Sequence, residues 1–440
     1  MELSRIPAVA YVRRHIHSLI SLTVRGLSVV AGFAVTLLIG RMFGPEANGH
    51  YAIVTQTAMF LSVVAVGGID LAVTRTFSAA AARKIQIELL SFLKVVGYSA
   101  AFSAILMIGV LLGGHRLMML LFNGPAPRGT ITVLILIMMA RTLTRMLGAV
   151  LRSQRAYALG QSVEVLLIPT LVLVLVGAGF ARDVEGILWM TAWVGVGVGV
   201  VAFLSSLRYT STSADALHVP MRQVLKIAAP LWGVAIFLNV SEWYGLATTS
   251  AILGVHDAGL YRVAAQVAGA LNIITLGLFS VYSPQFGAAA SERDMAKVAR
   301  LAGTASRLAI TFSLPAAILI FVLAGPLLQL LGEEFLRAEG ILRIAVVGQA
   351  IFTITGPSGL VLAMTGNERS NLLVTIVSTG TLLVAAPVAA HFGGLTGIVL
   401  CMSLLMIGRN LASMWFVRRR TGINVLTGGW NPPPDQAAAR

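Results

Sequence analysis

Eight basic residues stand inside long apolar segments of the sequence, where each charged side chain needs water, a partner or a ligand. They are Arg25, Lys94, Arg141, Arg145, Arg262, Arg307, Arg343 and Arg409. An ionisable group at the centre of a membrane-spanning helix costs about 2.5–3.5 kcal/mol or more. Seven of the eight are arginine, whose planar guanidinium suits the oxygens of anions better than the ammonium of lysine does. The pattern favours an anionic ligand.

Arg141 and Arg145 are four residues apart, so they share one face of a helix, and Gly148 and Arg152 continue that face. A cationic stripe cannot face lipid, and we expect it to line a wet cavity as a track for an anionic head group. The alternative is that Arg145 and Arg152 extend to the membrane interface while Arg141 pairs with a carboxylate on a neighbouring helix.

Arg25 lies about two turns into the first apolar segment beside the small residues Gly26 and Ser28, and we expect it to face the cavity. Arg262 and Arg343 either close the cavity from outside or extend to the outer interface. The other three, Lys94, Arg307 and Arg409, are expected to extend to the cytoplasmic interface.

Glu242 is a carboxylate deep in an apolar segment, and Asn239 lies one turn earlier on the same face. Burial raises a carboxyl pKa, so Glu242 could carry a proton, or the two side chains could help to hold sodium. The alternative is a structural pair with an arginine such as Arg262. Asp70 and Arg75 are expected to form an ion pair at the inner interface.

The composition explains why these charges lie in a membrane. Hydrophobic residues make up 57% of the 440 residues and charged residues 11%, against about 25% in soluble domains. The single cysteine, Cys401, excludes an intrachain disulfide and a cysteine-cluster metal site. We predict twelve spanning helices, the first of them uncleaved: 18–41, 48–71, 87–113, 130–151, 160–180, 185–207, 224–251, 258–283, 300–324, 339–363, 371–392 and 394–417.

One short corner between apolar segments occurs twice, at residues 42–51 and 252–261. Without a gap, Gly49 aligns with Gly259 and Tyr51 with Tyr261. The shift of 210 residues predicts two comparable lobes. The expected division is a cytoplasmic N-terminal segment 1–17, an N-lobe 18–207, a cytoplasmic linker 208–223, a C-lobe 224–417 and a cytoplasmic tail 418–440. The tail after Arg420 is expected to be disordered.

The placement of Lys and Arg predicts the orientation. With the N-terminus in the cytoplasm, nineteen of the 32 fall in cytoplasmic segments and five in outer ones. This bias accounts for most of the net charge of +15, so no nucleic-acid partner is required. The predicted fold is an all-α polytopic membrane protein, with both termini cytoplasmic and two parallel six-helix lobes around a central cavity.

Motifs of soluble enzymes are missing from the sequence. There is no Gly-x-x-x-x-Gly-Lys-Ser/Thr phosphate loop and no His-Glu-x-x-His metal motif. The longest expected outer loop, residues 113–129, is too short for the catalytic loop of a glycan polymerase or ligase. We therefore expect a transporter without a cofactor or metal, and coupling to a proton or sodium gradient stays open.

The segment from Arg25 through the corner at residues 42–51 to Asp70 resembles the first two helices of Wzx-type polysaccharide and O-antigen flippases. These belong to the multidrug/oligosaccharidyl-lipid/polysaccharide (MOP) exporter superfamily. Residues 230–285 resemble the seventh and eighth helices of that family, and residues 361–367 the end of the tenth. Phe43 replaces the leucine of the family pattern.

This resemblance implies an alternating-access flippase in the inner membrane. It would move a polyprenyl-pyrophosphate-linked oligosaccharide to the outer leaflet for lipopolysaccharide or exopolysaccharide synthesis, with membrane lipids and a glycan polymerase or other assembly proteins as partners. Arg25 and Arg262 match cavity arginines of the family in helix position, whereas Ala52 departs from the pattern and Arg141 could substitute. The alternatives are an ion-coupled multidrug antiporter, supported by Glu242, and a peptidoglycan-precursor flippase, which usually has fourteen helices.

Overall fold

The computed structural model describes residues 7–431, with side chains from residue 20 onward except those of Ser280 and Glu368. Residues 1–6 and 432–440, parts of the predicted terminal segments, lie outside this range. Contacts divide the chain into two compact units, Met1–Gly259 and Leu260–Arg440, and each is described by itself.

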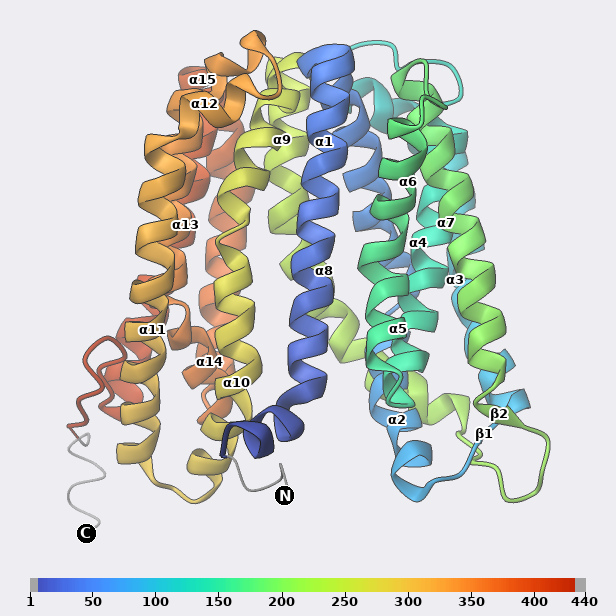
Figure 1. Ribbon diagram of the computed structural model, residues 1–440, viewed down its shortest axis with the longest axis vertical. Coiled ribbons are helices and arrows are strands. Elements are labelled where there is room, and N and C mark those ends of the chain that lie inside the picture. The colour runs from blue at the N-terminus through green and yellow to red at the C-terminus, as the bar shows by residue number, and fades with distance from the viewer. Residues whose placement is uncertain (1–6, 432–440) are drawn as a thin grey trace. The chain divides into compact units, whose positions relative to one another are not determined.

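The first unit consists almost entirely of helices (Figure 1). They are α1 (Pro7–Val66), α2 (Ile69–Arg83), α3 (Leu89–Leu121), α4 (Thr130–Ser153), α5 (Tyr157–Gln161), the π-helix η2 (Ser162–Leu166), α6 (Leu167–Gly177), α7 (Val184–Leu207), α8 (Met221–Leu253) and the start of α9 (Val255–Gly269). Two short parallel strands, β1 (Ile87–Glu88) and β2 (Thr210–Ser211), join the segment before α3 to the segment after α7.

The second unit continues with the rest of α9. It then contains α10 (Asn272–Ser291), α11 (Met295–Val322), α12 (Ala324–Gln329), the 3-10 helix η3 (Glu333–Ala338), α13 (Glu339–Thr355), α14 (Pro357–Met364) and α15 (Glu368–Thr421).

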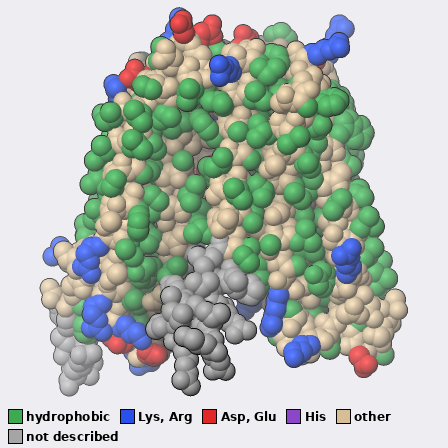
Figure 2. Space-filling view, in the orientation of Figure 1, with side chains coloured by type: hydrophobic (Ala, Val, Ile, Leu, Met, Phe, Trp, Pro, Cys, Tyr) green, Lys and Arg blue, Asp and Glu red, His purple; other side chains and the backbone are tan. Residues whose placement is uncertain are grey.

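The prediction of an all-α polytopic membrane protein is confirmed. Within the described residues, nine helices are long and apolar enough to span a membrane, and the bent pair Val255–Gly269 and Asn272–Phe279 makes ten. Two of the nine, Ile20–Val66 and Arg369–Thr421, are 47 and 53 residues long, more than twice the ~20 residues that a span needs. Counting each of these as two spans gives twelve. Figure 2 shows hydrophobic side chains along the helices and most of the visible charged ones near the helix ends.

The repeated corner has the same backbone conformation in both copies. Gly44 has φ 80° and ψ −176°, and Gly254 has φ 97° and ψ 173°, a region that glycine adopts without steric cost. Helix resumes directly at Pro45 and at Val255. The two long kinked helices α1 and α15 arise because their chains turn at a single glycine, Gly44 or Gly394, without a loop.

The two corners contact each other reciprocally within the first unit. A Cβ atom on Gly49 would lie 1.9 Å from the carbonyl oxygen of Val255, and one on Gly259 would lie 1.9 Å from that of Pro45. Pro45 and Val255 are 210 residues apart, as Gly49 and Gly259 are. Equivalent residues of the two corners therefore make equivalent contacts. Only glycine permits this approach of two backbones.

Two boundary predictions are wrong. The predicted loop 113–129 is mostly helix, because α3 continues to Leu121. The predicted disorder of the tail does not hold for residues 422–431. Ile423 forms a bridge to Trp430, and Ile423 and Val425 are buried in a cluster with residues of α10, α11, α14 and α15. Apolar burial therefore orders a segment whose glycines and prolines suggested disorder.

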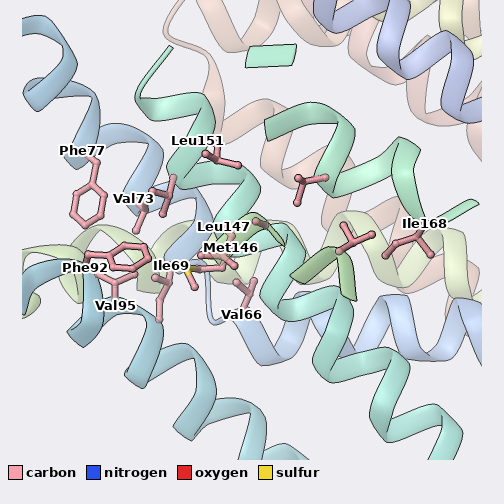
Figure 3. Packing of buried hydrophobic residues seen from close by; sticks show 14 of the residues in the cluster. Val66, Ile69, Val73, Phe77, Phe92, Val95, Met146, Leu147, Leu151 and Ile168 are labelled. Atoms are coloured by element: carbon pink, nitrogen blue, oxygen red, sulfur yellow. The ribbon is translucent and has the colours of Figure 1, made fainter. Parts of the chain in front are cut away.

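The core of the first unit surrounds α4. Its buried residues come mainly from α1, α2, α3, α4, α6, α7 and α8, and those shown in Figure 3 include Val66, Ile69, Val73, Phe77, Phe92, Val95, Met146, Leu147, Leu151 and Ile168. Of the most apolar 18-residue stretch of α4, 72% is buried, the largest share among the described spans. The helix that carries the arginine stripe is therefore largely enclosed by the other helices of the first unit.

Candidate functional site

The arginine stripe of α4 lies in this interior. Arg145 donates from Nε to the Oδ2 atom of Asp70 over 2.6 Å. The Asp70 side chain is 5% exposed and that of Arg145 21%. Asp70 stands in the first turn of α2, where a negative charge also interacts favourably with the helix dipole.

This pair replaces the predicted ion pair between Asp70 and Arg75, which is wrong. Five residues along a helix correspond to about 140° of rotation beyond one turn, so Arg75 points away from Asp70 and is exposed. The turn at Gly67 and Gly68, both with positive φ, places Asp70 against α4.

A second ion pair joins Arg152 of α4 to Glu164 of the π-helix η2. The same Glu164 residue accepts a hydrogen bond at its backbone carbonyl from Nη1 of Arg141 at 3.3 Å. A π-helix widens the helical turn and is common at functional sites. The helices are close here because Gly148 and Gly160 face each other, and a Cβ on either would lie 2.6–2.8 Å from the other's carbonyl oxygen.

Arg141 therefore differs from the other two arginines of the stripe. Arg145 and Arg152 each have a carboxylate, whereas Arg141 is partly buried and forms no ion pair within the described part of the chain. The alternative had Arg141 paired with a carboxylate on a neighbouring helix. Among the described residues, the two nearby carboxylates pair with the other arginines of the stripe, Asp70 with Arg145 and Glu164 with Arg152. The stripe holds three positive charges against two negative ones, and the uncompensated charge is at Arg141.

Gln161 adds an unsatisfied polar group to the same region. It is 2% exposed, its Oε1 atom accepts from the hydroxyl of Ser21 at 3.3 Å, and its Nε2 atom has no hydrogen-bond partner among the described residues. A buried donor without a partner is unusual in a folded protein. The sequence analysis missed Gln161, whose only sequence signal is an uncharged polar residue three positions before Glu164.

Arg25 approaches this region from α1. It follows Ser21 by four residues, so it shares the helix face that meets α5 through Gln161. The Arg25 side chain is exposed, and it forms no ion pair within residues 20–431. Arg25, Arg141 and Arg145 thus belong to elements that pack together in the first unit.

The remaining predicted site residues lie elsewhere. Glu242 is exposed on α8, and Asn239 donates from Nδ2 to the carbonyl oxygen of Ala235 in its own helix. Trp243, next to Glu242, stacks on Phe60 and donates to Thr57, which fixes α8 against α1. Arg262 is partly buried on α9 in the second unit.

Arginines of the second unit have local partners. Arg343 forms an ion pair with Glu339 one turn earlier at 2.6 Å and lies over the ring of Phe321. Arg409 lies over the ring of Phe352. Arg307 donates to the hydroxyl of Thr304.

No protein-family model and no curated protein matches the sequence. Solved structures of transporters do match. A multidrug resistance MATE family transporter of the MOP superfamily, in an inward-facing conformation, has a TM-score of 0.70 and 15% identity over 92% of this chain and 98% of that one. The lipid II flippase MurJ, in an inward closed conformation, has 0.68 and 14% over 91% and 87%. The MATE transporter VcmN from Vibrio cholerae has 0.63 and 17% over 93% and 97%.

These matches cover nearly the whole chain at identities that establish the fold alone. The chain therefore has the fold of MOP-superfamily transporters, and it is a multi-pass membrane protein.

Proposed function

We propose that this chain is an alternating-access flippase that moves a polyprenyl-pyrophosphate-linked oligosaccharide from the cytoplasmic to the outer leaflet of the inner membrane. Its role would be in polysaccharide biosynthesis, beside a glycan polymerase or other assembly proteins. Both termini would be cytoplasmic, as the Lys and Arg bias indicates. The fold shared with a lipid II flippase supports this class of cargo.

The observation that carries the proposal is the uncompensated charge of Arg141. Asp70 and Glu164 are engaged by Arg145 and Arg152, so an incoming anion would meet a guanidinium whose charge no carboxylate among the described residues neutralises, although its Nη1 atom donates to the Glu164 carbonyl oxygen. A pyrophosphate can accept two parallel hydrogen bonds from such a group. The amide nitrogen of Gln161 offers one more donor nearby. Arg25 and Arg262 are proposed as further contacts along the path, with Arg145 holding Asp70 in place.

An ion-coupled multidrug antiporter is the second candidate, because two of the three solved structures described above are MATE transporters. Glu242, exposed on α8, is its main support, with Asn239 as an oxygen neighbour. Cationic drugs require an acidic site, whereas the charge excess of the α4 stripe is positive. A peptidoglycan-precursor flippase is a third candidate and differs from the first only in the glycan.

Reconstitution into vesicles separates the first two candidates. The transbilayer movement of a fluorescent polyprenyl-pyrophosphate glycan is measured beside the efflux of ethidium. We expect glycan-lipid movement that Arg141→Ala reduces about tenfold or more, equivalent to about 1.4 kcal/mol, and that Arg25→Ala reduces less. Ethidium efflux without movement of the glycan lipid would refute the flippase.

A matched control is Arg116→Ala, which removes an exposed arginine of α3 and should leave the rate unchanged. The same vesicles test coupling: Glu242→Gln abolishes any dependence on a proton or sodium gradient if Glu242 carries the ion. Unchanged gradient dependence in this variant would leave Glu242 with a structural role.

A further inference from the structure

A cluster of exposed arginines lies at the end of the second unit where α15 finishes. We call it the arginine cluster, and it consists of Arg300 of α11 and Arg418, Arg419 and Arg420 in the last turn of α15. None of the four forms an ion pair among the described residues. Two acidic residues beside the start of α11 are already engaged, because Glu292 pairs with Lys297 at 3.2 Å and Asp294 accepts from the backbone N–H of Lys297. The cluster therefore carries positive charge that these carboxylates leave uncompensated.

The chain that follows α15, residues 422–431, holds the cluster in place, and we call it the C-terminal hairpin. Ile423 and Val425 bury their side chains, which are 0% and 1% exposed. Gly428 packs against α11, where its Cβ position would lie 3.7 Å from the Cα atom of Arg300. The hairpin thus joins the end of α15 to the start of α11. Arginines from two helices are consequently fixed beside each other and do not belong to a frayed helix end.

The exposed face of α15 indicates the depth of the cluster in the membrane. Leu411, Trp415 and Arg419 follow one another at four-residue spacing, so they share a helix face. Leu404 lies on the same face, and its side chain is exposed, as are those of Leu411 and Trp415. Tryptophan is enriched where a membrane meets water. The face thus passes from apolar residues through Trp415 to Arg419, which places Arg419 at the level of the lipid head groups.

Arg419 is oriented by Trp415 and keeps its hydrogen-bond donors. Its guanidinium carbon lies over the Trp415 ring, 5.1 Å from the centroid, within the range of a cation–π interaction. No side-chain hydrogen bond joins Arg419 to another residue within the described range. A guanidinium can donate two parallel hydrogen bonds to the oxygens of a phosphate. Arg419 therefore presents donors for a phosphate at head-group depth.

The opposite end of the second unit has the other sign. Glu333 and Glu334 are exposed in the first turn of η3. Figure 2 shows acidic side chains at this end, at the upper left, and several basic ones around the end of α15, at the lower left. An anionic lipid is consequently attracted to the arginine cluster and repelled at η3.

We propose that the arginine cluster binds an anionic phospholipid. Its guanidinium groups hold the phosphate, and the exposed apolar face of α15 contacts the acyl chains. A free anion or an acidic protein segment would not use that apolar face, whereas a phospholipid uses both parts. A lipid with a net negative charge should bind more tightly than a zwitterionic one, because each Lys or Arg near a membrane surface strengthens the binding of acidic lipids about fivefold.

Lipid binding tests this surface without any transport, so its result is independent of the proposed function. The full chain is purified in detergent and freed of phospholipid. Phosphatidylglycerol and phosphatidylcholine with identical acyl chains are titrated separately, and native mass spectrometry measures the dissociation constant of the first bound lipid. We expect the chain to bind phosphatidylglycerol about tenfold or more tightly than phosphatidylcholine.

Two exposed arginines separate this surface from the general positive charge of the chain. Arg419→Gln should reduce the preference for phosphatidylglycerol about fivefold. Arg83→Gln is the matched control, because it removes an exposed arginine from the end of α2 in the first unit. It should change the preference by less than about twofold.

Two further variants keep every charge. Trp415→Leu removes the ring under Arg419 at an exposed position and should reduce the preference about two- to threefold. Val425→Asn places a polar group at a buried position and should release the C-terminal hairpin, with a loss about as large as that of Arg419→Gln. The unfolding temperature of each variant verifies that the remaining chain is folded.

Equal binding of the two lipids would overturn the proposal, and so would a loss in Arg83→Gln as large as that in Arg419→Gln. A full preference in both Trp415→Leu and Val425→Asn would also overturn it, because the arginines would then attract lipid by charge alone and not as a surface that the hairpin builds.

Discussion

The two units satisfy the arginines of their spanning helices in different ways. In the first, Arg145 and Arg152 pair with carboxylates 75 and 12 residues away in the sequence, on other helical elements. In the second, Arg343 pairs with Glu339 on its own helix, and Arg409 lies over a ring. The first arrangement requires the helices to be packed together, whereas the Arg343–Glu339 pair can form in an isolated helix.

The difference shows that the repeat preserves the backbone but not the charges. The corner contact of Gly49 and Gly259 is reciprocal. A shift of 210 residues, however, takes Arg141 to Ile351 and Arg145 to Thr355. The cationic stripe therefore belongs to one half only, which places the proposed anion contact in the first unit.

The largest expected effect is the loss of the pair between Asp70 and Arg145. Asp70→Asn leaves Arg145 in the interior without its counter-ion and should destabilise the protein by about 3–5 kcal/mol. Thermal or denaturant unfolding in detergent measures this. Arg145→Gln in the same background should recover part of the loss, and two additive single effects would show that the pair is not coupled.

The second-largest expected effect is the loss of the contact between the two corners. Gly49→Ala and Gly259→Ala each place a methyl group against a backbone carbonyl oxygen and should cost about 1–3 kcal/mol, typical of overpacking. Gly26→Ala is the control, because nothing lies within 4 Å of its Cβ position, and it should be neutral or stabilising. Equal unfolding temperatures for all three variants would contradict the contact.

Arg343→Gln tests how much an arginine ion pair contributes to stability in the second unit. Its side chain is 41% exposed and its partner is one helical turn away, so its ion pair should contribute less than about 1 kcal/mol. The same unfolding measurement applies. A loss as large as that of Asp70→Asn would remove the contrast between the units.

The smallest effect concerns the strand pair outside the spans. Hydrogen bonds from Ser91 and then from His218 lower the pKa of Glu88 below its ordinary value of about 4.5. A lowered carboxyl pKa contributes stability that is complete above the ordinary value and disappears as pH falls through the folded-state value. The protection of residues 208–220 against hydrogen exchange, taken relative to the intrinsic rate at each pH, should therefore fall under acidic conditions.

Glu88→Gln is the control for this pH effect. It should make the exchange of residues 208–220 faster at neutral pH and remove the acid step. An acid step of unchanged size in this variant would assign the effect to another group.

Local signals in the sequence predicted the fold class, an all-α polytopic membrane protein. Hydropathy predicted the spans, and the glycine spacing of the corner predicted two turns that have the same φ and ψ regions. The continuous kinked helices were not predictable, because a glycine can either end a helix or bend it. The ordered part of the tail was missed because Ile423 and Val425 gain their burial from α10, α11 and α14, which are distant in sequence.

The site was predictable only in its cations. The i, i+4 spacing placed Arg141 and Arg145 on one face, but no local pattern identifies Asp70 as the partner of a residue 75 positions away. The π-helix that contains Glu164 and the close packing of Gly160 against Gly148 likewise have no local signal in the sequence.

The central claim is that Arg141 binds the anionic head group of the cargo, and equilibrium binding measures it most directly. The affinities of the purified chain for polyprenyl pyrophosphate and for the uncharged polyprenol are compared. We predict that the chain with Arg141 prefers the pyrophosphate about tenfold or more, and that Arg141→Gln abolishes this preference while Arg343→Gln retains it. An undiminished preference in Arg141→Gln would contradict the account.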